Sequence, residues 1–175
     1  MSTADLAAAL ERARNVYRRR PDLGLHDDAP ATACWTPGTR VVASHANGTR
    51  VETDMPSELG GTGDRVTPGW LFRAGLASCA ATTIAMTAAS EGIALTLLEV
   101  QVGSRSDTRG LLGIAQADGE PVSSGPQDMR LRVRIAAAPE VARERLRALV
   151  ETACRRAPVL NAVTCAQPIL LEIED

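Results

Sequence analysis

The residues best suited to covalent chemistry are four cysteines, Cys34, Cys79, Cys154 and Cys165. They lie far apart, without a C-x-x-C pair or the Cys/His spacing of a zinc site, so we expect no metal and no other cofactor. Cys79 falls near the middle of an almost uncharged stretch, AGLASCAATT, whose small residues allow close packing. A thiol reacts as its thiolate, which needs a nearby cation or oriented N–H donors. Without them Cys79 would be a buried core residue, the commoner role of a free cysteine.

Composition excludes several other chemistries. All 19 basic residues are arginine, so the chain has no lysine for a Schiff base, a pyridoxal phosphate anchor or a Walker-type phosphate loop. Its two histidines, His26 and His45, lie in polar, turn-like stretches without a catalytic signature. A net charge of −2 and an aromatic content of only 2% argue against a nucleic-acid partner.

A long helix over residues 68–92 is predicted to position Cys79. Thr67 and Pro68 suit the N-cap and the first helical position. The stretch is too apolar all round for a surface helix, so we expect it to be buried on several sides at the centre of the fold. Its many Ala, Gly, Ser and Thr residues favour a core helix over a membrane span.

Before this helix, the chain is predicted to contain an appendage and a small sheet. Residues 1–30 are expected to form an amphipathic helix over 3–20 and a connector. The main domain, residues 31–175, would begin with antiparallel strands within 31–55, separated by turns at Pro37-Gly38 and Asn47-Gly48. The glycine-rich GGTGD loop is expected to be a hinge.

After the helix, the pattern predicts two strands, a second helix and a last strand. LTLLEVQVGSRS and MRLRVRIAA alternate, with Arg130, Arg132 and Arg134 on the wet face. A helix opens at Pro139 and is interrupted at Pro158, and PILLEIE forms a closing strand. This order of elements predicts an α+β fold.

The segment ELGGTGDRVTPGWLFRAGLASCAATT resembles the OsmC/Ohr family of cysteine-based proteins. In that family a glycine-rich loop leads through a Thr/Asn-Pro helix start to a central helix with a peroxidatic cysteine, which here is Cys79. Over residues 31–175 the resemblance implies an OsmC-like antiparallel sheet around a long buried helix, in an intertwined homodimer. The family's thiolate attacks the O–O bond of an organic hydroperoxide, and a second cysteine captures the sulfenic acid as a disulfide.

The chain departs from the family pattern in the groups that activate the cysteine. The family's activating Arg is held by a Glu ten residues before the cysteine, where this chain has Gly69. Arg40 is the nearest match to that Arg, and Arg65 and Arg73 are substitutes.

The chain also departs from the pattern at the resolving cysteine. The family's Cys-Pro pair is Ala157-Pro158 here. Cys154 lies one helical turn earlier and is either a displaced resolver or a core residue. Cys34 and Cys165 lie on or beside predicted strands and are expected to be structural.

Three functions are open at this point. The chain could be a thiol peroxidase that reduces organic hydroperoxides in oxidative stress defence, with Cys79, Arg40 and Cys154 as its site and a small thiol or dithiol as reductant. It could instead be a one-cysteine enzyme whose sulfenate is reduced directly by an external thiol. The changes at positions 69 and 157 could also mark a non-catalytic or differently tasked member of the fold. We expect a cytoplasmic, bacterial homodimer with no membrane or nucleic-acid partner.

Overall fold

The computed structural model describes residues 2–165 and 167–174, which form an α+β fold. Contacts divide the chain into two compact units, Ala13–Ala74 and Met1–Arg12 together with Gly75–Asp175. The predicted N-terminal helix is present as α1 (Thr3–Arg19), which buries no residue and is followed by a short 3-10 turn, Pro21–Gly24.

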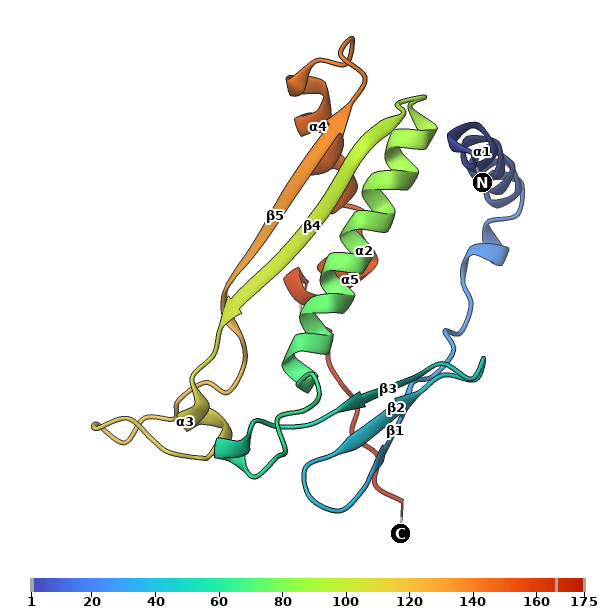
Figure 1. The fold of residues 1–175 in the computed structure, drawn as a ribbon. Helices are drawn as coiled ribbons and strands as arrows, with labels where there is room; N and C mark the ends of the chain where they lie inside the picture. The colour runs from blue at the N-terminus through green and yellow to red at the C-terminus, as the bar shows by residue number, and fades with distance from the viewer. Residues whose placement is uncertain (1, 166, 175) are drawn as a thin grey trace. The chain divides into compact units, whose positions relative to one another are not determined.

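The unit Ala13–Ala74 contains a three-stranded antiparallel sheet, which confirms the predicted meander (Figure 1). Its strands are β1 (Thr32–Trp35), β2 (Val41–Ser44) and β3 (Arg50–Thr53). The turns between them use Gly38 and Gly48, whose φ angles of +92° and +91° favour glycine. The two predicted turn signals therefore mark the ends of the strands correctly.

The glycine-rich loop after β3, which the sequence predicts to be a hinge, is hydrogen-bonded to Asp54. Asp54 is only 2% exposed. Its carboxylate accepts hydrogen bonds from the hydroxyl of Thr39 at 2.5 Å, the hydroxyl of Thr62 at 2.7 Å and the N–H of Thr62 at 3.1 Å. These bonds, and one from the N–H of Met55, hold the pKa of Asp54 well below its ordinary value. A Cβ on Gly61 would lie 1.8 Å from the carbonyl oxygen of Met55, so the loop passes too close for any other residue.

The long helix α2 (Pro68–Ser90) starts where the sequence predicted. The N–H of Trp70 donates to the hydroxyl of Thr67 at 3.1 Å, which makes Thr67 the N-terminal cap. By length and composition α2 could also cross a membrane, a property that it shares with core helices of soluble proteins.

Within one chain, α2 is buried on one face. The buried residues repeat at nearly every fourth position: Leu76, Ala80, Ile84, Ala88 and Ala89. On the remaining surface Trp70, Phe72 and Met86 are 48%, 36% and 38% exposed. One chain therefore leaves part of the apolar surface of α2 exposed.

In the unit that contains Gly75–Asp175, α2 packs on a long antiparallel pair of strands, β4 (Leu95–Arg105) and β5 (Gln127–Ala137) (Figure 1). The short helix α3 (Thr108–Leu111) lies in the segment between the strands. The helix α4 (Arg143–Cys154) packs with α2 on the inner face of the strands, and α5 (Pro158–Thr164) follows it. The core joins these elements: Ile84, Ala88, Ile93, Leu146, Leu149 and Ala153 form its buried cluster.

Two elements differ from the sequence prediction. The second helix begins at Arg143 and not at Pro139, because β5 continues to Ala137 and the N–H of Val141 closes a turn on the carbonyl of Ala138.

The predicted closing strand is absent from the described part of PILLEIE. Its apolar side chains are almost fully exposed: Ile169, Leu170, Leu171 and Ile173 at 94%, 83%, 78% and 82%. An alternating segment forms a strand only where a sheet edge accepts it.

Replacing Asp54 by Asn should lower the midpoint of thermal unfolding at pH 7 by about 5 °C, because an amide cannot replace a carboxylate that accepts several hydrogen bonds. The lowered pKa sets the sign of the pH dependence. The carboxylate stabilises the fold fully above its unfolded-state pKa of about 3.9, and this contribution is lost as the pH falls through the lower folded-state pKa. The difference between the two proteins, followed by circular dichroism, should therefore shrink below about pH 4.

Asp28, whose side chain is 98% exposed, provides the matched control. Asp28→Asn should leave the midpoint nearly unchanged at every pH. Equal losses in the two variants, or a difference that does not depend on pH, would contradict the role given to Asp54.

Candidate functional site

Cys79 lies partly buried on α2, next to Ala80, which is fully buried. The N–H of Val159, at the start of α5, points to the Cys79 sulfur at an N–Sγ distance of 3.4 Å. An N–H donor stabilises a thiolate more than a thiol. The structure therefore supplies one of the oriented donors that the sequence could not show.

The same contact places residue 157 near Cys79. Ala157 caps α5, two residues before Val159, and has no exposed surface. This is the position where the family resemblance implies a resolving cysteine. The chain has a buried methyl group there in place of a thiol.

The other cysteines have different surroundings. Cys154, the last residue of α4, packs against the hydrophobic cluster, and burial raises the pKa of its thiol. A raised pKa reduces the fraction of thiolate that could attack a sulfenic acid. Cys34 on β1 and Cys165 after α5 are exposed, and all four thiols are free. Within residues 2–165 and 167–174, no group of three or more His, Cys, Asp or Glu side chains could hold a metal.

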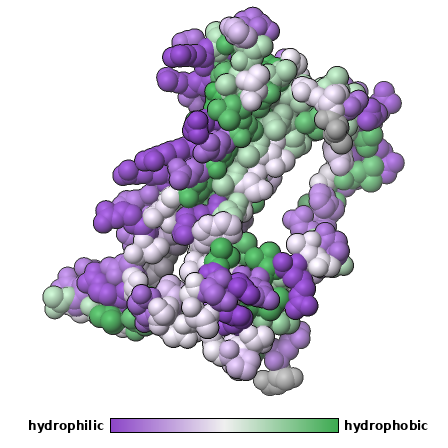
Figure 2. Space-filling model, viewed as in Figure 1, coloured by the Kyte–Doolittle hydropathy of each residue, from purple (hydrophilic) through white to green (hydrophobic). Residues whose placement is uncertain are grey.

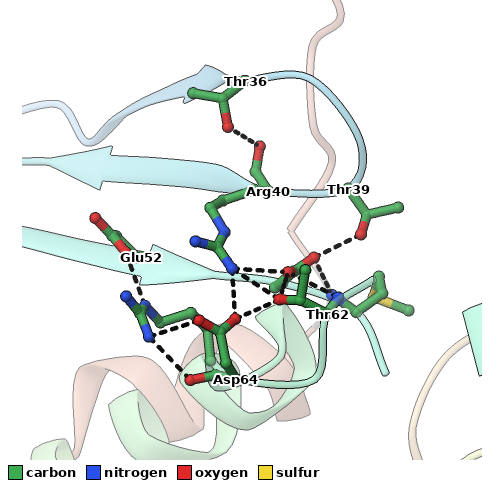
Figure 3. Close-up of polar contacts among 9 residues, drawn as sticks. Thr36, Thr39, Arg40, Glu52, Thr62 and Asp64 are labelled. Atoms are coloured by element: carbon green, nitrogen blue, oxygen red, sulfur yellow. Dashed lines mark hydrogen bonds and ion pairs between the residues drawn. The ribbon is translucent and has the colours of Figure 1, made fainter. Parts of the chain in front are cut away.

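In the unit Ala13–Ala74, Arg40 belongs to a dense polar network (Figure 3). Its guanidinium donates to the Asp54 carboxylate at 3.2 Å, to the Thr62 hydroxyl at 2.8 Å and to the Asp64 carboxylate. The side chain is 29% exposed, so part of the guanidinium still reaches solvent. Two carboxylates orient Arg40 although position 69 has none.

The substitutes for Arg40 have partners as well. Arg65 forms ion pairs with Glu52 at 2.7 Å and with Asp64 at 2.9 Å. Arg73 lies one turn after Gly69, and a Cβ at position 69 would stand 3.6 Å from its guanidinium. Sequence reasoning missed Asp54 and Asp64 as partners of Arg40. The aspartate at the end of GGTGD was the available signal.

A small apolar pocket of about 160 Å³ is lined by residues close in sequence to Cys79 and Val159, although neither of these two residues lines it. Leu76, one helical turn before the cysteine, and Leu160, next to Val159, both line it. The remaining lining is mostly apolar: Val102, Met129, Leu131 and Val163, with Arg130 and Thr164. A hydrocarbon group could be accommodated there.

Comparison with known proteins agrees with this architecture. A family model described as OsmC-like protein matches residues 61–172, a range that includes Cys79, Cys154 and Ala157 but not Arg40. No curated protein sequence matches the chain.

Solved structures of the family share the fold. An OsmC-like protein from Mycoplasma pneumoniae is 17% identical with a TM-score of 0.66, over 81% of this chain and 91% of that one. An organic hydroperoxide resistance protein from Legionella pneumophila is 23% identical with a TM-score of 0.54, over 79% and 90%. A putative organic hydroperoxide resistance protein from Vibrio cholerae, with captopril bound in one of its active sites, is 25% identical with a TM-score of 0.51, over 79% and 87%. Because the family model covers more than half of the sequence and the fold agrees, the chain belongs to the OsmC-like protein family.

Proposed function

We propose that the chain is a thiol peroxidase that reduces organic hydroperoxides with Cys79 as its nucleophile. The observation that carries the proposal is the hydrogen bond from the N–H of Val159 to the Cys79 sulfur, which joins α2 to the start of α5. Leu76 on α2 and Leu160 on α5 also line a small apolar pocket. The N–H can hydrogen-bond a reacting sulfur, and the pocket could hold the organic part of the substrate.

The proposed reaction is a two-electron oxidation of sulfur. The Cys79 thiolate attacks the terminal oxygen of R–O–OH, so that an S–O bond forms and the O–O bond breaks. The leaving alkoxide takes up a proton and departs as the alcohol, and Cys79 becomes a sulfenic acid. The pocket favours substrates with an alkyl or aryl group over hydrogen peroxide, because only the former can bury apolar surface there.

An external thiol is proposed to regenerate the enzyme. A first thiol forms a mixed disulfide with Cys79 and releases water, and a second thiol displaces the cysteine and leaves as a disulfide. The family's resolving position is occupied by Ala157, which has no thiol. Cys154 is the remaining candidate for an internal resolver, but the raised pKa of its thiol disfavours its attack on the sulfenic acid.

Arg40 is proposed to supply the cation for the reaction, as the family resemblance implies. Its support in this chain is the pair of carboxylates, Asp54 and Asp64, that orient the guanidinium. A positioned guanidinium would stabilise both the thiolate and the developing alkoxide.

The purified protein should consume cumene hydroperoxide in the presence of dithiothreitol, followed by a xylenol orange assay. Cys79→Ser should abolish consumption, because no other thiol has this setting. Cys154→Ser should leave the rate within about twofold if an external thiol completes the cycle. Without reductant, one equivalent of peroxide should add one oxygen to the intact mass.

Other outcomes would overturn parts of this scheme. Loss of two hydrogens, in the wild type but not in Cys154→Ser, would identify Cys154 as the resolver. A wild-type protein that consumes no peroxide would favour the non-catalytic member of the fold. Arg40→Gln tests the cation separately, and an unchanged rate would exclude Arg40 from activation.

Ala157→Cys should install an internal resolver, because residue 157 is two residues from the N–H that contacts Cys79. One equivalent of peroxide should then produce a disulfide between Cys79 and the new cysteine, seen as loss of two hydrogens and as a cross-linked peptide. This bond needs Cα atoms within about 7 Å. The control is Arg156→Cys at the neighbouring exposed position, which should form no such bond. Equal cross-linking from both positions would contradict the proposed geometry.

We propose in addition that the chain forms a homodimer. The apolar surface that one chain leaves exposed supports it: Trp70, Phe72 and Met86 on α2, and Ile169, Leu170, Leu171 and Ile173 near the end of the chain. Apolar surface of this extent normally marks an interface.

Light scattering should therefore give about twice the chain mass at micromolar concentration. Met86→Glu should shift the protein towards monomer, because a charge at a buried apolar interface is costly. The control is Leu112→Glu, at a 57% exposed position outside α2. A wild-type monomer at all concentrations would exclude the dimer.

A further inference from the structure

The strand pair β4–β5 has a second face that the proposed peroxidase chemistry does not use. On β5, Leu131, Val133 and Ile135 alternate with Arg130, Arg132 and Arg134, and the apolar residues face the helices. The arginines therefore extend from the opposite, exposed face, where Figure 2 shows hydrophilic side chains gathered along the strand.

The arginines on this face differ in how their charge is balanced. Arg134 stands opposite Glu99 in the strand register and forms an ion pair with it at 2.7 Å. Further along the sheet, Arg105 lies 3.7 Å from Asp128. Both outer arginines thus have an acidic partner.

The two central arginines lack such a partner. Arg132 stands opposite Gln101 and Arg130 opposite Gly103, both neutral residues. Among residues 2–165 and 167–174, no carboxylate lies within ion-pair distance of either guanidinium. Side chains two residues apart on one strand are separated by about 7 Å, so the two positive charges repel each other across a short distance.

The unpaired arginines border a hollow in the surface. It measures about 430 Å³ and is lined by Gln101, Gly103, Ser104, Arg105, Asp128, Arg130 and Arg132. Gly103 has no side chain to fill the hollow, and the space where its Cβ would stand is empty within 4 Å. The lining contributes three positive charges and one negative charge, in a chain whose net charge is −2.

We propose that this hollow binds a small anion with two or more phosphate groups. Guanidinium groups bind phosphate oxygens through paired, charge-assisted hydrogen bonds. Two arginines about 7 Å apart along one strand can each engage one phosphate of a diphosphate, which a single carboxylate does not allow. The hollow falls within the usual range of small-molecule sites, about 300–1,000 Å³. None of the described residues that line it is aromatic, so none of them could stack on a base. The phosphate groups are therefore what the site recognises.

Isothermal titration with inorganic diphosphate tests this site independently of peroxidase activity. Saturable binding of one diphosphate per chain is expected at low salt. Orthophosphate should bind about tenfold more weakly, because it can engage only one of the two central arginines at a time. Arg130→Gln or Arg132→Gln should weaken diphosphate binding about tenfold. The matched control is Arg134→Gln, on the same strand and face, which should weaken it less than about threefold because Glu99 already neutralises that arginine.

Gln101→Glu separates loss of the site from loss of the fold. It places a carboxylate opposite Arg132, as Glu99 stands opposite Arg134, so it should raise the midpoint of thermal unfolding while binding falls about tenfold. The proposal is overturned if binding does not saturate, if Arg134→Gln weakens it as much as Arg132→Gln, or if Gln101→Glu leaves it unchanged. Any of these results would mean that the arginines are only a solvated strand face.

Discussion

The close packing of one face of α2 against α4 and the β4–β5 pair determines where the candidate groups around Cys79 lie. The contact uses small residues, among them Ala80, Ala88 and Ala153, each no more than 1% exposed. With α4 held in this way, the chain turns at Ala157 and starts α5 beside the cysteine. The N–H of Val159 is then directed at a sulfur that lies 80 residues earlier in the sequence. Larger side chains on this face of α2 would separate α4 from it, and the donor would be displaced from the sulfur.

Local signals in the sequence were sufficient for most elements of the fold. The turns at Gly38 and Gly48, the cap at Thr67 and the alternation along β4 and β5 each depend on interactions within a few residues. The failures have a different origin. A closing strand around Ile169 needs a sheet edge to pair with, and the alternation of its residues does not show whether such an edge exists. The start of α4 was misplaced because Pro139, suited to a first helical turn, also suits the turn that ends β5.

The candidate site was predictable in its residue types but not in its contacts. Cys79 could be singled out from its setting and from the family motif. The partners of Arg40 could not, since Asp54 follows β3 and Asp64 lies in a loop, and only the folded sheet brings them to the same guanidinium. The acidic residue missing at position 69 suggested an arginine without support. In the structure, carboxylates from other segments of the chain pair with Arg40, although position 69 has none.

The two departures from the family pattern affect different steps of the proposed chemistry. In the family, the acidic residue at position 69 orients the cation near the thiolate, and this cation affects the rate at which the O–O bond is attacked. The group at position 157 concerns only what happens afterwards, because a resolving thiol acts once the sulfenic acid exists. A buried methyl group at Ala157 leaves the approach of Val159 to the sulfur intact. The chain has thus kept the groups that would form a sulfenic acid and has lost the one that would trap it internally. In the proposed scheme, the sulfenic acid would then be reduced by a thiol from outside the chain.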